Sequence, residues 1–211
     1  MFQMHPDPAY RRSLEEFYRH LNDVFHFRPS AIPDVFIIPD KTAFNALIRR
    51  TSAEWEIGCA QDGAIYFLAL DVIKATETHE NYSVDDLGRA IRHEAAHVYF
   101  NQLTKKRDER KMPRWLSEGL ATYWSGQQER RNLVKVFEHL NDQDPAAMKY
   151  HYGEGGTAVQ RLIEVFGIEK LKVLLGRLVD EKDVSHFAER FADVYGFPPT
   201  DEEFNQRLRS N

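Results

Sequence analysis

The stretch His93-Glu94-Ala95-Ala96-His97 decides how the rest of this chain is interpreted. On an α-helix, residues four positions apart lie above one another on the same face, so two such imidazoles can bind one metal ion at roughly 2.0–2.1 Å each. Glu94 falls beside that face, where its carboxylate can reach a water at the metal. This H-E-x-x-H pattern therefore predicts a zinc site with an adjacent general base.

The residues around this motif predict a helix from about Val84 to Leu103. Ser83 and Asp86 have the spacing of a capping box, and Asp85 adds negative charge at the positive end of the helix. Apolar side chains recur near the helical period at Leu87, Ile91, Val98, Tyr99 and Leu103. The two histidines are therefore expected in the middle of one helix.

Composition limits the class of protein. The 211 residues are enough for one sizeable domain and too few for two large ones. The formal net charge of −5 is spread over mixed charges, so no nucleic-acid partner and no polybasic membrane patch are expected. No apolar run reaches the roughly 18 residues of a membrane span. Cys59 is the only cysteine, which excludes an internal disulfide and a zinc site built from cysteines.

The N-terminus lacks the basic segment and apolar core of a signal peptide. A cytoplasmic location is therefore expected if the chain is complete, and a secreted or periplasmic one if a leader has been removed. The sequence leaves both the compartment and the oligomeric state open.

Local patterns predict a small sheet with helices in the first half of the chain. Asp7-Pro8 is typical of a helix start, and Asp62-Gly63 of a tight hairpin turn. The expected elements are a helix at 8–25, a strand at 35–38, a helix at 41–50, and hairpin strands at 54–60 and 64–70.

The second half is predicted to be helical. The helices are expected at 114–124, at 130–140, from Gly155 or Gly156 to 166, at 168–179, at 184–195 and at about 200–208. The charged run at 105–111 is expected to be a solvated loop. The sequence thus predicts one α+β domain over 1–211, with an α/β part at about 31–125 and a helical part at about 126–211.

A third ligand is needed, because a catalytic zinc site usually has three protein ligands and leaves the fourth position to water. Glu118 is the best candidate, on the helix expected at 114–124. Its neighbours Trp115, Leu116 and Leu120 are apolar, so its carboxylate is expected where that helix packs. A buried carboxylate is unfavourable unless it is compensated, and a metal ion would compensate it. An ordinary surface glutamate is the alternative.

The motif at 93–97, followed by W-L-S-E-G-L-A at 115–121, resembles the gluzincin metallopeptidases, the thermolysin-like MA clan. The second motif is more similar to the aminopeptidase-type and small peptidase MA-like branches than to thermolysin. The resemblance covers most of 31–208. It implies that His93, His97 and Glu118 bind one zinc ion per chain and that Glu94 is the general base.

Tyr152-Gly153-Glu154-Gly155 resembles the Y-x-x-G segment of those branches, in which a tyrosine hydroxyl binds the tetrahedral oxyanion. The resemblance implies this role for Tyr152, and such a donor contributes roughly 3–4 kcal/mol. Tyr150 and His151 remain alternatives, because a loop is expected here and its register is loose.

One departure from the family concerns residues 64–70. Aminopeptidases of the clan carry a G-x-M-E-N segment there, whose glutamate binds the free amine of the substrate, whereas this chain has no acidic residue. An endopeptidase is therefore expected. The same strand would hold an extended peptide by main-chain hydrogen bonds if it lay at a sheet edge.

The resemblance thus implies a zinc-dependent endopeptidase acting on peptide or protein substrates. One alternative is a non-proteolytic zinc-binding interaction or regulatory module on the same fold, although an intact Glu94 argues against it. The other is a helical scaffold without metal. Thr122, one turn after Glu118, is a candidate for orienting a ligand imidazole. Cleavage specificity and activation stay open.

Overall fold

The computed structural model describes residues 6–105, 112–142, 144, 147–179 and 185–208. Within these residues the structure contains one small sheet, and most of the other elements are helices. The predicted mixed α+β fold class is therefore confirmed. The chain divides into two compact units, Met1–Val98 and Tyr99–Asn211. The expectations for 106–111 and 180–184 lie outside the described residues. No described helix combines the length and the apolar character needed to cross a bilayer.

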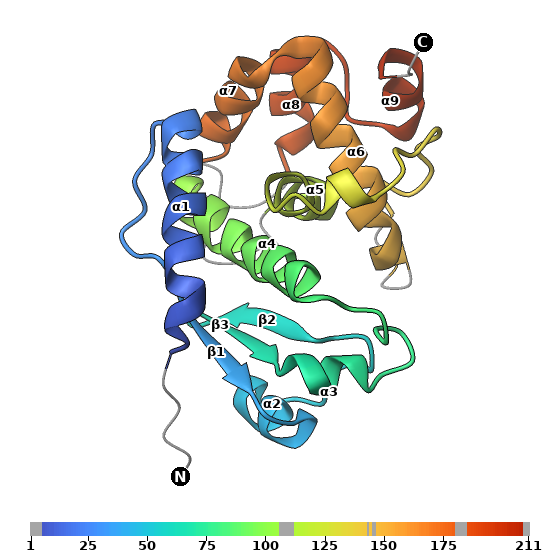
Figure 1. Cartoon of the computed structure of the whole chain (residues 1–211). Coiled ribbons are helices and arrows are strands. Elements are labelled where there is room, and N and C mark those ends of the chain that lie inside the picture. The colour runs from blue at the N-terminus through green and yellow to red at the C-terminus, as the bar shows by residue number, and fades with distance from the viewer. Residues whose placement is uncertain (1–5, 106–111, 143, 145–146, 180–184, 209–211) are drawn as a thin grey trace. The chain divides into compact units, whose positions relative to one another are not determined.

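The sheet of unit 1 has the strand order β1-β3-β2 (Figure 1). β1 (Asp34–Ile38) runs parallel to β3 (Ala64–Leu68), and β2 (Gly58–Gln61) runs antiparallel to it. Asp62 and Gly63 connect β2 to β3 with positive φ angles of 52° and 80°, as an Asp-Gly hairpin turn requires. β3 is therefore central. The edge strands are β1 and β2, so β3 is not at the sheet edge that a peptide could extend.

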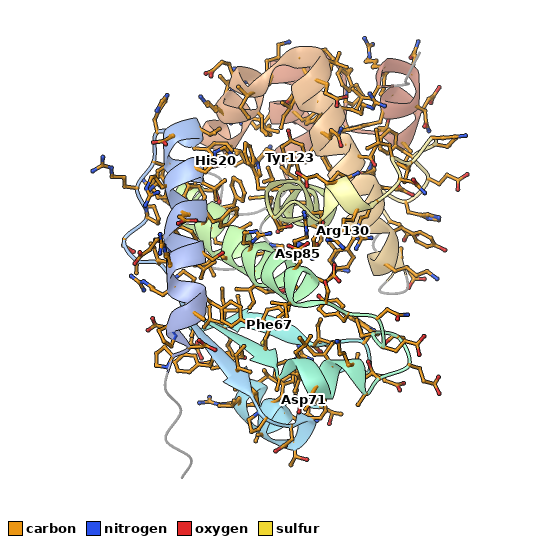
Figure 2. All side chains as sticks on the ribbon, in the orientation of Figure 1. His20, Phe67, Asp71, Asp85, Tyr123 and Arg130 are labelled. Carbon is orange, nitrogen blue, oxygen red and sulfur yellow. The ribbon has the colours of Figure 1, made fainter. Side chains whose placement is uncertain are left out.

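Three helices and the first part of a fourth accompany this sheet. They are α1 (Pro8–Phe25), α2 (Lys41–Ile48), α3 (Leu70–Lys74) and α4 (Val84–Leu103). Asp7 caps α1 as the sequence predicts, since its Oδ1 accepts from Ala9 N at 2.9 Å, and Asp40 caps α2, since its Oδ1 accepts from Ala43 N at 2.8 Å. The short helix α3, which carries Asp71 (Figure 2), was not predicted.

Helix α4 begins and ends where the sequence predicts. Ser83 and Asp86 form the reciprocal capping box, because Asp86 N donates to Ser83 Oγ at 3.1 Å and Ser83 N donates to Asp86 Oδ2 at 2.9 Å. Asp85, labelled in Figure 2, lies in the first turn. The helix is also anchored in its middle, where the Tyr18 hydroxyl of α1 donates to the Ala95 carbonyl at 3.0 Å.

Unit 2 is helical around an aromatic core. Its helices are α5 (Arg114–Trp124), the 3₁₀ turn η2 (Gln128–Arg130), α6 (Met148–Phe166), α7 (Ile168–Leu178), α8 (Phe187–Tyr195) and α9 (Asp201–Arg207). Trp115 is buried, and its ring lies 6.0, 6.2 and 5.3 Å from those of Phe187, Phe191 and Phe204. These edge-on contacts join α5 to α8 and α9.

Helices α5 and α6 approach each other closely at two glycines. A Cβ on Gly155 would lie 2.3 Å from the Trp115 carbonyl oxygen, and a Cβ on Gly119 would lie 2.4 Å from the Gly155 carbonyl oxygen. No side chain fits at either position, so glycine is required for this crossing.

Residues 131–142 are not helical, and the helix predicted at 130–140 is wrong. Five of the backbone N–H groups in this segment bind side chains of α6 and α9. The four acceptors are Thr157 Oγ1 for Val134 N (3.2 Å), Asn205 Oδ1 for Phe137 N (2.8 Å), Glu154 Oε2 for Glu138 N and His139 N (3.2 and 2.9 Å), and Asp201 Oδ1 for Leu140 N (3.2 Å). These bonds fix the segment as an ordered, irregular strap on α6 and α9.

Candidate metal centre

His93 and His97 lie one turn apart in the middle of α4, and each is only 5% exposed. Their Nε2 atoms are 3.1 Å apart, and the planes of the two rings are inclined by 82°. Two nitrogens bound to one tetrahedral ion at 2.0–2.1 Å would be separated by about 3.3 Å. The pair therefore has the convergent arrangement that the sequence predicts.

Glu118 lies on α5 and is 8% exposed, among buried apolar neighbours, as expected. It forms a buried group with His93 and His97, in which one candidate ligand atom from each residue lies within 4.8 Å of the others. This group could hold a metal ion. Two imidazole nitrogens and one carboxylate oxygen are a donor set that zinc accepts in catalytic sites.

Glu94, the predicted base, is bound to the edge strand of the sheet. Its Oε2 accepts a hydrogen bond from Ala60 N of β2 at 3.0 Å. Because Ala60 is paired across from Ile65 while its N–H reaches Glu94, that N–H points away from β3. This contact was not predicted from the sequence. The Asp62-Gly63 turn does fix which residues of β2 face outward, but it does not reveal which helix lies beside them.

Tyr150, His151 and Tyr152 lie in the first turns of α6, because this helix begins at Met148 and not at Gly155 or Gly156. The expectation of a loop at these residues is therefore wrong. On a helix, Tyr150 and Tyr152 project in nearly opposite directions, about 200° apart.

The three alternatives for the oxyanion role have different surroundings. Tyr150 is 41% exposed and stacks on His139 with a centroid distance of 4.2 Å. His151 is fully buried, and its Nε2 lies 2.9 Å from the His139 carbonyl oxygen, so its ring contacts the strap. Tyr152 is half-buried and precedes Gly155 by one turn, on the side of α6 that meets α5. The role of Tyr152 remains a prediction.

Thr122 does not orient an imidazole, contrary to the expectation. It is completely buried, and its Oγ1 makes no hydrogen bond with the residues that the structure describes. Its methyl group faces α6, where a Cβ on Gly156 would lie 3.0 Å from it. The spacing of one helical turn from Glu118 was therefore not sufficient to predict a contact.

A second buried carboxylate, Glu154, lies on α6 and is 5% exposed. Burial raises its pKa above the ordinary value, and the backbone N–H groups of His139 and Glu138 oppose this effect only in part. The carboxylate of Asp201, which binds Leu140 N, also has a raised pKa because of burial. Both carboxylates accept hydrogen bonds from the strap, and neither belongs to the group of His93, His97 and Glu118.

No protein-family model matches this chain, and no curated protein or solved structure is significantly similar to it.

Proposed function

We propose that this protein is a zinc-dependent endopeptidase of the gluzincin type. The observation that supports the proposal is the buried group of His93, His97 and Glu118, two imidazoles and one carboxylate within 4.8 Å of one another. The first two residues enclose a glutamate in an H-E-x-x-H motif on one helix. Three protein ligands leave a fourth position of a tetrahedral ion for water or substrate.

Zinc, when bound by this group, supplies the Lewis acidity that activates water and polarises a carbonyl. Glu94 accepts the proton of the attacking water and delivers it to the leaving amine. The Ala60 N–H holds one oxygen of the Glu94 carboxylate and so limits its orientation. Tyr152 donates a hydrogen bond to the oxyanion of the substrate in this proposal.

The edge strand β2 supplies the proposed binding surface for the substrate. An extended peptide can add to a sheet edge through main-chain hydrogen bonds, and Ala60 of this strand already contacts the proposed base. Neither β2 (Gly58–Gln61) nor β3 (Ala64–Leu68) carries an acidic residue that would bind the free amine of a substrate. This composition favours cleavage within a chain over removal of the first residue.

The substitution Glu94→Gln tests this proposal. We expect the wild type to contain about one zinc per chain and to cleave internal bonds of a peptide library. The variant should retain its zinc and lose roughly a thousandfold in kcat, because general-base catalysis contributes about 10²–10⁴-fold. Metal content is measured by mass spectrometry and hydrolysis with fluorogenic peptides.

Glu169→Gln, on the exposed surface of α7, is the matched control and should change neither quantity. Undiminished hydrolysis in Glu94→Gln would refute its role as base. A wild type that binds zinc yet cleaves no peptide would favour the non-proteolytic module, and a wild type without zinc would favour the scaffold.

A further inference from the structure

We infer that the loop at 50–57, with the exposed ring of Trp55, forms a distal subsite for a large apolar side chain of an extended peptide. The inference rests on the proposed peptidase function and specifies its substrate class. All residues that support it belong to unit 1.

The loop is rigidly held although it lies at the surface. The Arg50 guanidinium forms a forked pair with the Glu56 carboxylate, with one of its contacts at 2.7 Å. Lys41 Nζ donates to the carbonyl oxygens of Ala53 and Glu56 at 2.9 and 2.6 Å. Glu56 N also donates to Ala53 O at 3.1 Å. Cations on α2 and at its end therefore fix both sides of the turn that carries Trp55.

A second set of bonds fixes the beginning of the loop. The Asn45 carboxamide oxygen accepts from Ser52 N at 2.9 Å and from Ser52 Oγ at 2.5 Å. Asn45 belongs to α2, so the loop is attached to a helix at two places. A surface that is already ordered loses little conformational freedom when a ligand binds, which favours affinity.

Trp55 is 52% exposed and is the largest of the exposed hydrophobic side chains among the described residues. Trp115, in contrast, is 1% exposed. Single exposed apolar residues are common and usually have no role. Trp55 differs because it stands on a rigid loop, where tryptophan can act as a low-entropy anchor for a binding partner.

The loop continues directly into the proposed substrate strand. Leu68 N donates to Ile57 O at 2.9 Å, so the alignment with β3 already begins at Ile57, two residues after Trp55. Trp55 precedes Ala60 by five residues, or at most about 17 Å at 3.3 Å per residue. A peptide on the β2 edge with its scissile bond near Glu94 would therefore reach Trp55 with a residue no more than about five positions from that bond.

The first experiment compares cleavage by the wild type and by Trp55→Ala on peptides of about ten residues. The peptides carry phenylalanine or alanine at each distal position in turn. We expect phenylalanine at one position to raise kcat/KM by about tenfold in the wild type and by nothing in the variant. Trp55→Phe should keep most of the preference. Val173→Ala, at an exposed apolar residue of α7, is the control and should keep all of it.

The second experiment measures binding without catalysis. In zinc-loaded Glu94→Gln, the phenylalanine peptide should change the tryptophan emission, and the added substitution Trp55→Ala should abolish the change. A uniform effect of Trp55→Ala on all peptides, or none, would overturn the subsite even if the wild type is an active peptidase. If the wild type cleaves nothing, the peptidase proposal fails, and the emission change alone decides whether Trp55 binds apolar peptides.

Discussion

Two buried glutamates on adjacent helices of unit 2 have different surroundings. Glu154 of α6 is 5% exposed, and its carboxylate accepts the N–H groups of Glu138 and His139. Glu118 of α5 is 8% exposed, and its carboxylate belongs to a group with His93 and His97. The first arrangement attaches an irregular segment to a helix, whereas the second brings together a donor set that could hold a metal ion.

The comparison shows that burial alone does not identify a functional carboxylate. Two neutral N–H groups compensate the charge of Glu154 only in part, and its pKa therefore remains raised. A metal ion beside Glu118 would compensate its charge directly. The chemistry of the partners, more than the depth of burial, distinguishes a structural carboxylate from a ligand.

The strongest test of this distinction is to remove each carboxylate in turn. We expect Glu118→Ala to lower zinc affinity by about a hundredfold or more, because it removes one of the three proposed ligands. Glu154→Ala should leave zinc affinity unchanged within a factor of about three, because it does not reach the metal group. Affinity is measured by competition with a chromophoric chelator. Equal losses in both variants, or none in Glu118→Ala, would contradict the assignment.

Helix α4 was predictable from sequence because its signals lie within the element itself. The capping box at Ser83 and Asp86 and the apolar period specify its start, its end and its inward face. The histidine pair follows from helical geometry alone. The prediction of Glu118 as the third ligand depended on its apolar neighbours and on the second motif, which was interpreted through the family resemblance.

The strap at 131–142 was not predictable, because the groups that shape it lie far away in the chain. Phe137 N binds Asn205, 68 positions away, and Leu140 N binds Asp201, 61 positions away. Its apolar residues happen to recur with a helical period, and no local signal contradicts a helix. Periodicity reports which side chains are buried, but not where the backbone finds its hydrogen bonds.

The start of α6 was predicted too late, at Gly155 or Gly156 instead of Met148. Glycine destabilises a helix interior, yet Gly153, Gly155 and Gly156 all lie inside this helix. In the structure, Gly155 permits the backbone of α5 to approach α6.

Likewise, the hydrogen bond between Ala60 and Glu94 joins a strand to a helix residue that lies 34 positions away. Only the tertiary arrangement reveals either feature.

Removal of the structural carboxylate should affect stability and not metal binding. Glu154→Ala leaves the N–H groups of Glu138 and His139 without their acceptor, which should lower the free energy of unfolding by about 2 kcal/mol. Glu154→Gln keeps an acceptor oxygen and should cost less than about 1 kcal/mol at neutral pH. Urea denaturation measures both values. Equal destabilisation by the two substitutions would show that loss of the acceptor oxygen is not what destabilises Glu154→Ala.

The pH dependence of stability gives a smaller but independent test. Because the pKa of Glu154 is raised above its ordinary value of 4.5, the folded state binds its proton more tightly than the unfolded state does. The resulting stabilisation is fully present below about pH 4.5 and is lost as the pH rises through the folded pKa. The unfolding free energy of the wild type, minus that of Glu154→Gln, should therefore decrease between pH 4 and pH 7. Urea titrations at matched pH values, with a chelator present throughout, measure this difference, in which the titration of all other groups largely cancels.

A difference that increases with pH would mean that the two N–H groups favour the ionised carboxylate more than burial opposes it. Glu154 would then resemble a charged ligand more than a neutral structural group.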